Sequence, residues 1–145
     1  MFLIELFLII ICAYLSIYTA YILMLLFAHF FIKEKNKLPF TPKNRFAIII
    51  PAHNEELLLS RLLQSINKQH YPSGLFKTIV IADNCSDGTA KIGKENGAIA
   101  LERFDKLNRG KGYAIKYALE NINIKKYDAM FIIDADSVVD KDLLK

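Results

Sequence analysis

Two carboxylates one residue apart, Asp134 and Asp136, follow the apolar run from Met130 to Ile133. Alternate residues of a strand project to the same face, so we expect both acids to point the same way from a strand tip. Like charges held that close repel each other unless a cation lies between them. Mg²⁺ and Mn²⁺ take carboxylate oxygens while also gripping phosphates. The pair therefore indicates either a divalent metal site or a solvated acidic loop.

Polar clusters also follow three earlier apolar runs of the chain. PAHNEE follows the first, DNCSD the second and FDKLNRGKG the third. In the third cluster Lys111 stands between Gly110 and Gly112, and glycines permit a ligand to approach the backbone closely. A lysine and a metal on the same edge of a sheet would suit a diphosphate group. Each cluster also has a structural interpretation as a helix cap or turn.

The elements that must position these clusters alternate between strands and amphipathic helices. Four apolar runs predict strands, at residues 46–50 (ended by Pro51), 78–82, 98–101 and 127–133. Between them we expect one helix capped by Asn54, a short helix at 90–95, and a third helix opened by Asn108 to Gly112. This alternation is typical of an α/β fold with a parallel βαβαβαβ sheet. Ligands of such sheets bind outside the carboxyl ends of the strands.

The amino-terminal part has a different composition. No charged residue occurs from Leu6 to Ile32, which is long enough for a membrane-spanning helix and too long for a signal-peptide core. We expect a transmembrane helix at 1–32, a basic juxtamembrane linker at 33–45 and a soluble domain at 46–145. The linker carries five basic residues and one acidic residue. This bias predicts a single span with the domain on the cytoplasmic side, and contact with anionic membrane lipid.

The remaining composition gives two exclusions. Positive charge is concentrated in the linker and no basic stripe is interleaved with aromatic residues, so we expect no nucleic-acid partner. The two cysteines, Cys12 in the span and Cys85 in the domain, have no metal-like spacing and cannot pair across the membrane boundary.

Four motifs in this order, IIIPAHNEE, VIADNCSDGT, NRGKGYAIKYAL and FIIDADS, resemble the amino-terminal half of a family 2 glycosyltransferase. The resemblance covers residues 46 to about 142. It implies a Rossmann-like, GT-A nucleotide-sugar-binding domain that is incomplete at its carboxyl end. With the preceding span, it resembles the membrane-anchored branch of the family. It further implies Mn²⁺ or Mg²⁺ as cofactor and transfer of a hexose from a UDP-sugar to a glycan (polysaccharide) or lipid-linked acceptor.

The resemblance assigns roles to individual residues. The loop implied to hold the base and ribose consists of Pro51, Ala52, His53, Asn54 and Glu55. Asp83 matches the aspartate that bonds the edge of the base, and Lys111 matches a basic residue near the diphosphate. Asp134 and Asp136 match the DxD pair, the first near the ribose and metal and the second on the metal.

No catalytic residue is identifiable, because the family's general base is expected beyond Lys145. We therefore expect little transferase activity from these residues alone, and a partner chain that supplies the missing half is one arrangement. A second hypothesis is a non-catalytic, membrane-anchored nucleotide-sugar-binding subunit. DADSV also fits a haloacid-dehalogenase-like phosphatase, but that motif belongs after a first strand. No G-x-G-x-x-G follows the first strand, and Gly112 stands where a Walker A loop needs Ser or Thr.

Overall fold

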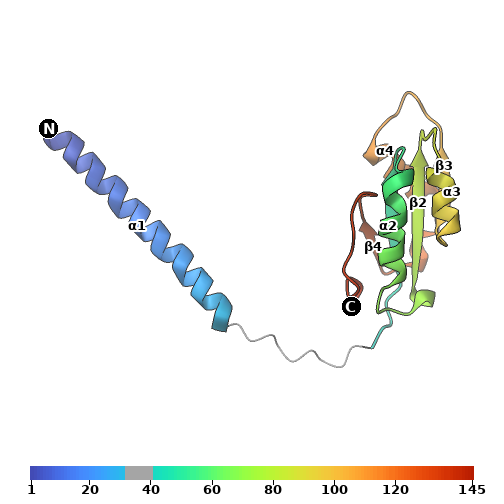
Figure 1. Cartoon of the computed structure of the whole chain (residues 1–145), viewed down its shortest axis with the longest axis horizontal. Coiled ribbons are helices and arrows are strands. Elements are labelled where there is room, and N and C mark those ends of the chain that lie inside the picture. Colours follow the sequence, from blue (N-terminus) through green and yellow to red (C-terminus); the bar gives the residue numbers. More distant parts are fainter. Residues whose placement is uncertain (32–40) are drawn as a thin grey trace. The chain divides into compact units, whose positions relative to one another are not determined.

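The computed structural model describes residues 1–31 and 41–145, with the side chains of residues 29–31 excepted. Its amino-terminal part is one helix, α1 (Phe2–Phe31), drawn in blue in Figure 1. Residues Phe2–Ala28 of this helix are long and apolar enough to cross a membrane, with a mean hydropathy of 2.3. Residue 32 and the first part of the expected linker, residues 33–40, lie outside the described residues.

The second part is an α/β domain built on one parallel sheet of four strands. The strands are β1 (Phe46–Ala52), β2 (Phe76–Asp83), β3 (Ile99–Arg103) and β4 (Ala129–Ile132). Their order in the sheet is β3-β2-β1-β4, and every neighbouring pair is parallel. After β3 the chain therefore crosses back over the sheet to pair with β1. The predicted α/β class and parallel sheet are confirmed.

Helices cover both faces of this sheet. They are α2 (Glu56–Asn67), α3 (Thr89–Glu95) and α4 (Lys111–Asn121), with 3-10 turns at Ser73–Leu75 and Ile124–Lys126. Figure 1 shows α2 and α3 over the same face, where α2 packs on alternate residues of β1 such as Ile48 and Ile50. On the opposite face, α4 packs through Ala114 and Ala118. The apolar side chains of the helices and strands thus form two core layers, one on each face of the sheet.

Pro51 does not end the first strand, contrary to the sequence prediction, because β1 continues through it to Ala52. The backbone N–H and C=O groups of successive β1 residues point alternately to β2 and to β4. The Ile49 carbonyl points to β4 and accepts a hydrogen bond from the Ile133 N–H. Pro51 faces that same side, but the pairing with β4 stops at Ile49. The missing N–H of proline therefore leaves no ladder position empty.

The fourth strand is shorter and less buried than its apolar sequence suggests. It comprises Ala129–Ile132, not residues 127–133, and Met130 and Ile132 are 45% and 51% exposed. Phe131 and Ile133 point to the other face and pack against the core beneath α2. Only one face of this strand is therefore well packed, since β4 lies at the edge of the described sheet.

The segment after β4 returns along α2 and closes the core on that face. The backbone N–H of Val139 donates to Oγ of Ser65 (3.1 Å), and Nε2 of Gln69 donates to the carbonyl of Asp140 (2.5 Å). Leu144 is only 3% exposed. These contacts hold the turn that carries the two aspartates between β4 and a fixed segment.

Candidate functional site

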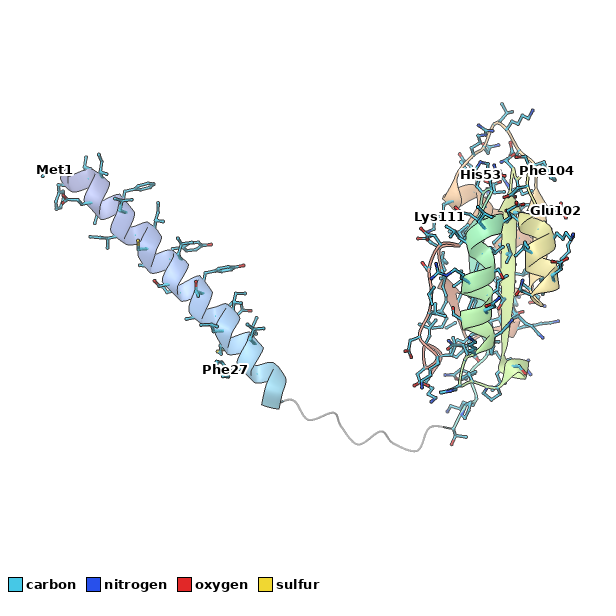
Figure 2. All side chains as sticks on the ribbon, in the orientation of Figure 1. Met1, Phe27, His53, Glu102, Phe104 and Lys111 are labelled. Atoms are coloured by element: carbon cyan, nitrogen blue, oxygen red, sulfur yellow. The ribbon has the colours of Figure 1, made fainter. Side chains whose placement is uncertain are left out.

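A cavity of about 290 Å³ opens at the carboxyl ends of β1 and β2. Residues of three segments line it: Pro51, Ala52, His53, Asp83, Asn84, Arg109, Gly110, Lys111 and Ala114. Figure 2 shows His53 and Lys111 at the same end of the domain. The cavity thus joins the first, second and third polar clusters of the sequence, because parallel strands bring their carboxyl ends to one edge.

Asp83 forms a buried carboxylate in the wall of the cavity and is 7% exposed. Its Oδ1 accepts hydrogen bonds from Nη1 of Arg103 (2.6 Å) and from Nδ2 of Asn84 (3.0 Å). Among the described residues, Oδ2 of Asp83 has no hydrogen-bond partner. It is therefore the carboxylate oxygen available to a ligand.

His53 lies beside Asp83, and its Nδ1 donates to the Asp83 backbone carbonyl (2.7 Å). Since a carbonyl only accepts, the Nδ1 atom of His53 carries a proton in this hydrogen bond. The imidazole is exposed at the cavity mouth. It presents a flat ring on which a planar base can stack.

The loop between β3 and α4 brings two cations to the cavity, Arg109 and Lys111. Gly110 between them has φ 113°, which a side chain would strain. Gly110 also immediately precedes the first turn of α4, and no side chain caps that turn. Helix N-terminal N–H groups attract anions, so they reinforce the two cations. Gly112, by contrast, has open space where a Cβ would lie, with no atom within 4 Å, so the protein's own packing does not require a glycine there.

Asp134 and Asp136 lie in a turn after β4, closed by a hydrogen bond from the Ser137 N–H to the Asp134 carbonyl (3.1 Å). The strand ends at Ile132, before both residues, so the alternation of side chains along a strand does not set the directions of the two carboxylates. Both are exposed, whereas Ala135 between them is 4% exposed. Asp134 forms an ion pair with Lys111, which links this turn to the cavity.

Asp134 and Asp136 supply only two protein carboxylates for a metal ion. No group of three or more His, Cys, Asp or Glu residues in the described chain could hold a metal ion. Two carboxylates suit Mg²⁺ or Mn²⁺, which commonly keep water and phosphate oxygens as further ligands. They do not suit a structural zinc site, which needs four protein ligands.

Asn54 and Glu55 do not line the cavity. Asn54 has φ 55° and its Oδ1 accepts from the Ser86 N–H (2.8 Å), so it does not cap the helix as predicted. The loop after β2 and the first residue of α3 cap α2 instead: the Glu55 N–H donates to Oγ1 of Thr89 (2.9 Å), and the Glu56 N–H donates to Oδ2 of Asp87 (3.2 Å). These bonds hold the first two loops of the site in register.

Hydrogen bonds also perturb titratable groups around the site. The pKa of Asp87 is lowered because bonds from Thr89 and Glu56 outweigh its partial desolvation. Bonds from Asn108 lower the pKa of Asp105 in the β3–α4 loop. Burial raises the pKa of the Cys85 thiol, which keeps it protonated near neutral pH.

Of the nine residues to which the resemblance assigned roles, five line the cavity: Pro51, Ala52, His53, Asp83 and Lys111. Asp134 reaches it through Lys111, and Asp136 contacts none of its lining residues by a hydrogen bond or ion pair within the described chain. Three further residues were not identified from the sequence. Asn84 and Arg109 line the cavity, and Arg103 pairs with Asp83. The basic character of NRGKG was the available signal for Arg109.

The parallel sheet, its crossover after β3 and the cavity at the strand ends define an α/β domain of the GT-A class. Residues 47–145 match the family model described as glycosyl transferase family 2. The chain belongs to this family.

Individual relatives agree with that assignment. Poly(ribitol-phosphate) beta-N-acetylglucosaminyltransferase TarS of Staphylococcus aureus is 27% identical over 103 residues, which are 70% of this chain and 18% of TarS. The crystal structure of TarS 1-349 in complex with UDP-GlcNAc matches with a TM-score of 0.57 at 26% identity, covering 67% of this chain and 28% of that one. The mannosyltransferase PcManGT from Pyrobaculum calidifontis, in complex with GDP-Man and Mn²⁺, matches with a TM-score of 0.59, covering 83% of this chain and 36% of that one. Its 23% identity shows the fold alone. The chain spans 18% to 40% of the length of the first curated relatives it matches.

Proposed function

We propose that the cavity binds the nucleoside diphosphate of a sugar donor, most favourably a UDP-sugar, for a metal-dependent hexosyltransferase. One observation carries the proposal: the cavity combines a buried carboxylate, Asp83, with two cations, Arg109 and Lys111, on the carboxyl edge of the sheet. A nucleoside diphosphate has matching chemistry, an N–H donor on its base and an anionic diphosphate.

The base is held at the Asp83 end of the cavity. Oδ2 of Asp83 accepts from a ring N–H, which uracil has at N3 and guanine at N1, whereas cytosine and adenine present a ring acceptor instead. Pro51, Ala52 and His53 form the neighbouring wall, and Asn54 and Glu55 connect it by hydrogen bonds to the segment after β2. TarS and PcManGT were solved with UDP-GlcNAc and GDP-Man, whose bases both have this N–H.

The diphosphate is held by Lys111, Arg109 and the first turn of α4. Asp134 and Asp136 would hold Mn²⁺ or Mg²⁺, which neutralises charge on the leaving diphosphate when bound. In the structure, Lys111 pairs with Asp134. Donor binding exchanges this ion pair: Lys111 turns to the phosphate, which frees Asp134 for the ribose and metal.

The setting we propose is a membrane. Helix α1 serves as a single transmembrane anchor and places the domain on the cytoplasmic side, next to membrane lipid. The acceptor is a polysaccharide or lipid-linked glycan. The relatives' greater length leaves room for acceptor-binding and general-base residues, in the same polypeptide or a partner chain.

The test is donor binding and turnover by the full chain in detergent or nanodiscs. Calorimetry should show saturable, Mn²⁺-enhanced binding of UDP, and membranes with UDP-GlcNAc and Mn²⁺ should be assayed for UDP release. Binding without release favours the non-catalytic subunit. Release of phosphate from a phosphomonoester, with no UDP binding, would replace this proposal with the phosphatase hypothesis.

A further inference from the structure

Arg103, the last residue of β3, is almost fully buried beside the proposed donor site, with 8% exposure. It is the register partner of Asp83 on β2, and the Asn84 N–H donates to its backbone carbonyl (2.7 Å). Register partners on parallel strands project to the same face. The sheet itself therefore brings the guanidinium and the Asp83 carboxylate together.

The guanidinium also forms hydrogen bonds with the loop between β3 and α4. Nη2 of Arg103 donates to Oδ2 of Asp105 (2.9 Å) and to the backbone carbonyl of Asn108 (2.7 Å). The guanidinium carbon of Arg103, Cζ, lies 5.9 Å from the ring centre of Tyr113 in α4, within the range of a cation–π contact. One planar group thus contacts the end of β2, the β3–α4 loop and the first turn of α4.

The loop has further bonds of its own. Oδ1 of Asp105 accepts from the N–H groups of Leu107 and Asn108, both at 3.0 Å. Asn84 donates to the Asp105 carbonyl (3.1 Å) and accepts from its N–H (2.9 Å). The residues that follow, Arg109 to Lys111, line the cavity. The position of these cations relative to Asp83 therefore depends on Arg103.

We propose that Arg103 is a positioning residue of the donor site: it fixes the Asp83 carboxylate for base recognition and holds the loop that presents the diphosphate-binding cations. This inference rests on the proposed function of the cavity. Arg103 occupies Oδ1 of Asp83 and so directs Oδ2 to the ligand. The planar guanidinium of Arg103 donates to Asp83 and to the β3–α4 loop at the same time, which the single ammonium of lysine cannot reproduce.

The test compares UDP, CDP and uridine binding by the full chain in detergent, with and without Mn²⁺. The variant is Arg103→Lys, because loss of the whole charge would strand a buried carboxylate. The preference for UDP over CDP should fall about tenfold, the usual scale for one charged hydrogen bond. Circular dichroism should show a folded domain. The control is Lys94→Gln, which breaks an exposed pair with Glu102 (3.0 Å) next to Arg103 and should leave the preference unchanged.

A second variant, Asp105→Asn, keeps the Arg103–Asp83 pair and weakens the hold on the loop. UDP binding should fall severalfold while uridine binding and the UDP-to-CDP preference are retained. This variant also decides the question if Arg103→Lys does not fold. An unchanged preference in folded Arg103→Lys, or equal losses of UDP and uridine in Asp105→Asn, would overturn the positioning role. Failure of the wild-type chain to bind either UDP or GDP would instead overturn the proposed function, and this role with it.

Discussion

Asp83 and Arg103 face each other across neighbouring parallel strands, with Oδ1 and Nη1 2.6 Å apart. The pair forms because β3 extends to Arg103, two residues beyond the apolar run that the sequence marks as a strand. A buried pair of this kind contributes little net stability, since desolvation offsets the attraction. Its role here is geometric, because it fixes one oxygen of a carboxylate in the cavity wall and leaves the other without a hydrogen-bond partner among the described residues.

Lys111→Ala should weaken UDP binding more than uridine binding, because only UDP carries the diphosphate. We expect about a tenfold loss for UDP, the scale of one charged hydrogen bond. Titration calorimetry of both ligands measures the difference. Lys116→Ala is the control, since Lys116 lies on the same helix and is 71% exposed in a pair with Glu120. Equal losses for UDP and uridine would count against the diphosphate assignment.

Asp136→Ala should abolish the Mn²⁺-dependent part of UDP affinity and leave the fold intact, because the exposed side chain makes no core contact. UDP titrations with Mn²⁺ and with EDTA give the metal-dependent increment directly. Glu95→Ala removes an acid from a mainly exposed position on α3 and serves as the matched variant. Undiminished Mn²⁺-dependent affinity in Asp136→Ala would refute its role as a metal ligand.

Asp134→Asn should have opposite effects with and without metal. The change releases Lys111 from its ion pair, so metal-free UDP binding should become severalfold tighter. It also removes a carboxylate from the metal, so the Mn²⁺ enhancement should shrink. Titrating the variant with UDP once without metal and once with Mn²⁺ gives both the metal-free affinity and the Mn²⁺ enhancement. A loss of metal-free affinity would show that the ion pair does not compete with the diphosphate.

Thr89→Val should destabilise the domain by about 1–2 kcal/mol, because it removes a helix cap and leaves the partly buried Glu55 N–H unpaired. Thr89 is fully buried, and its hydroxyl bonds both Asp87 (2.5 Å) and the Glu55 N–H (2.9 Å). Urea unfolding followed by circular dichroism measures the change. Thr78→Val, the same substitution at a half-buried position of β2, should cost much less. Similar costs for both would mean that the cap bonds contribute nothing.

Acid should loosen the β3–α4 loop through Asp105. Its pKa in the folded protein is lowered, chiefly by the Asn108 N–H, so its carboxylate stabilises the fold above the unfolded value of about 3.9. That contribution is lost as pH falls through the lower, folded pKa. The difference in thermal stability between wild type and Asp105→Asn should therefore be full at neutral pH and shrink on acidification. A difference independent of pH would contradict the assignment.

Local sequence signals predicted the fold and much of the site. Apolar runs alternate with amphipathic helices, and that pattern alone required a parallel sheet whose polar strand ends share one edge. His53, Asp83 and Lys111 could therefore be placed together. Register could not be read from the sequence, so the contact between Arg103 and Asp83 was missed. The exposure of Met130 was missed for a similar reason, since an edge strand and a central strand have the same apolar pattern.

The proposed recognition of the base by Asp83 is tested most directly by titrating the full chain with UDP in the presence of Mn²⁺ and repeating the titration with Asp83→Asn, which keeps an oxygen for Arg103. It predicts saturable one-to-one binding by the wild-type chain that is lost in the folded variant, because the carboxylate that recognises the base is gone. No binding of UDP or GDP to the folded wild-type chain, or equal UDP affinity in both proteins, would contradict it.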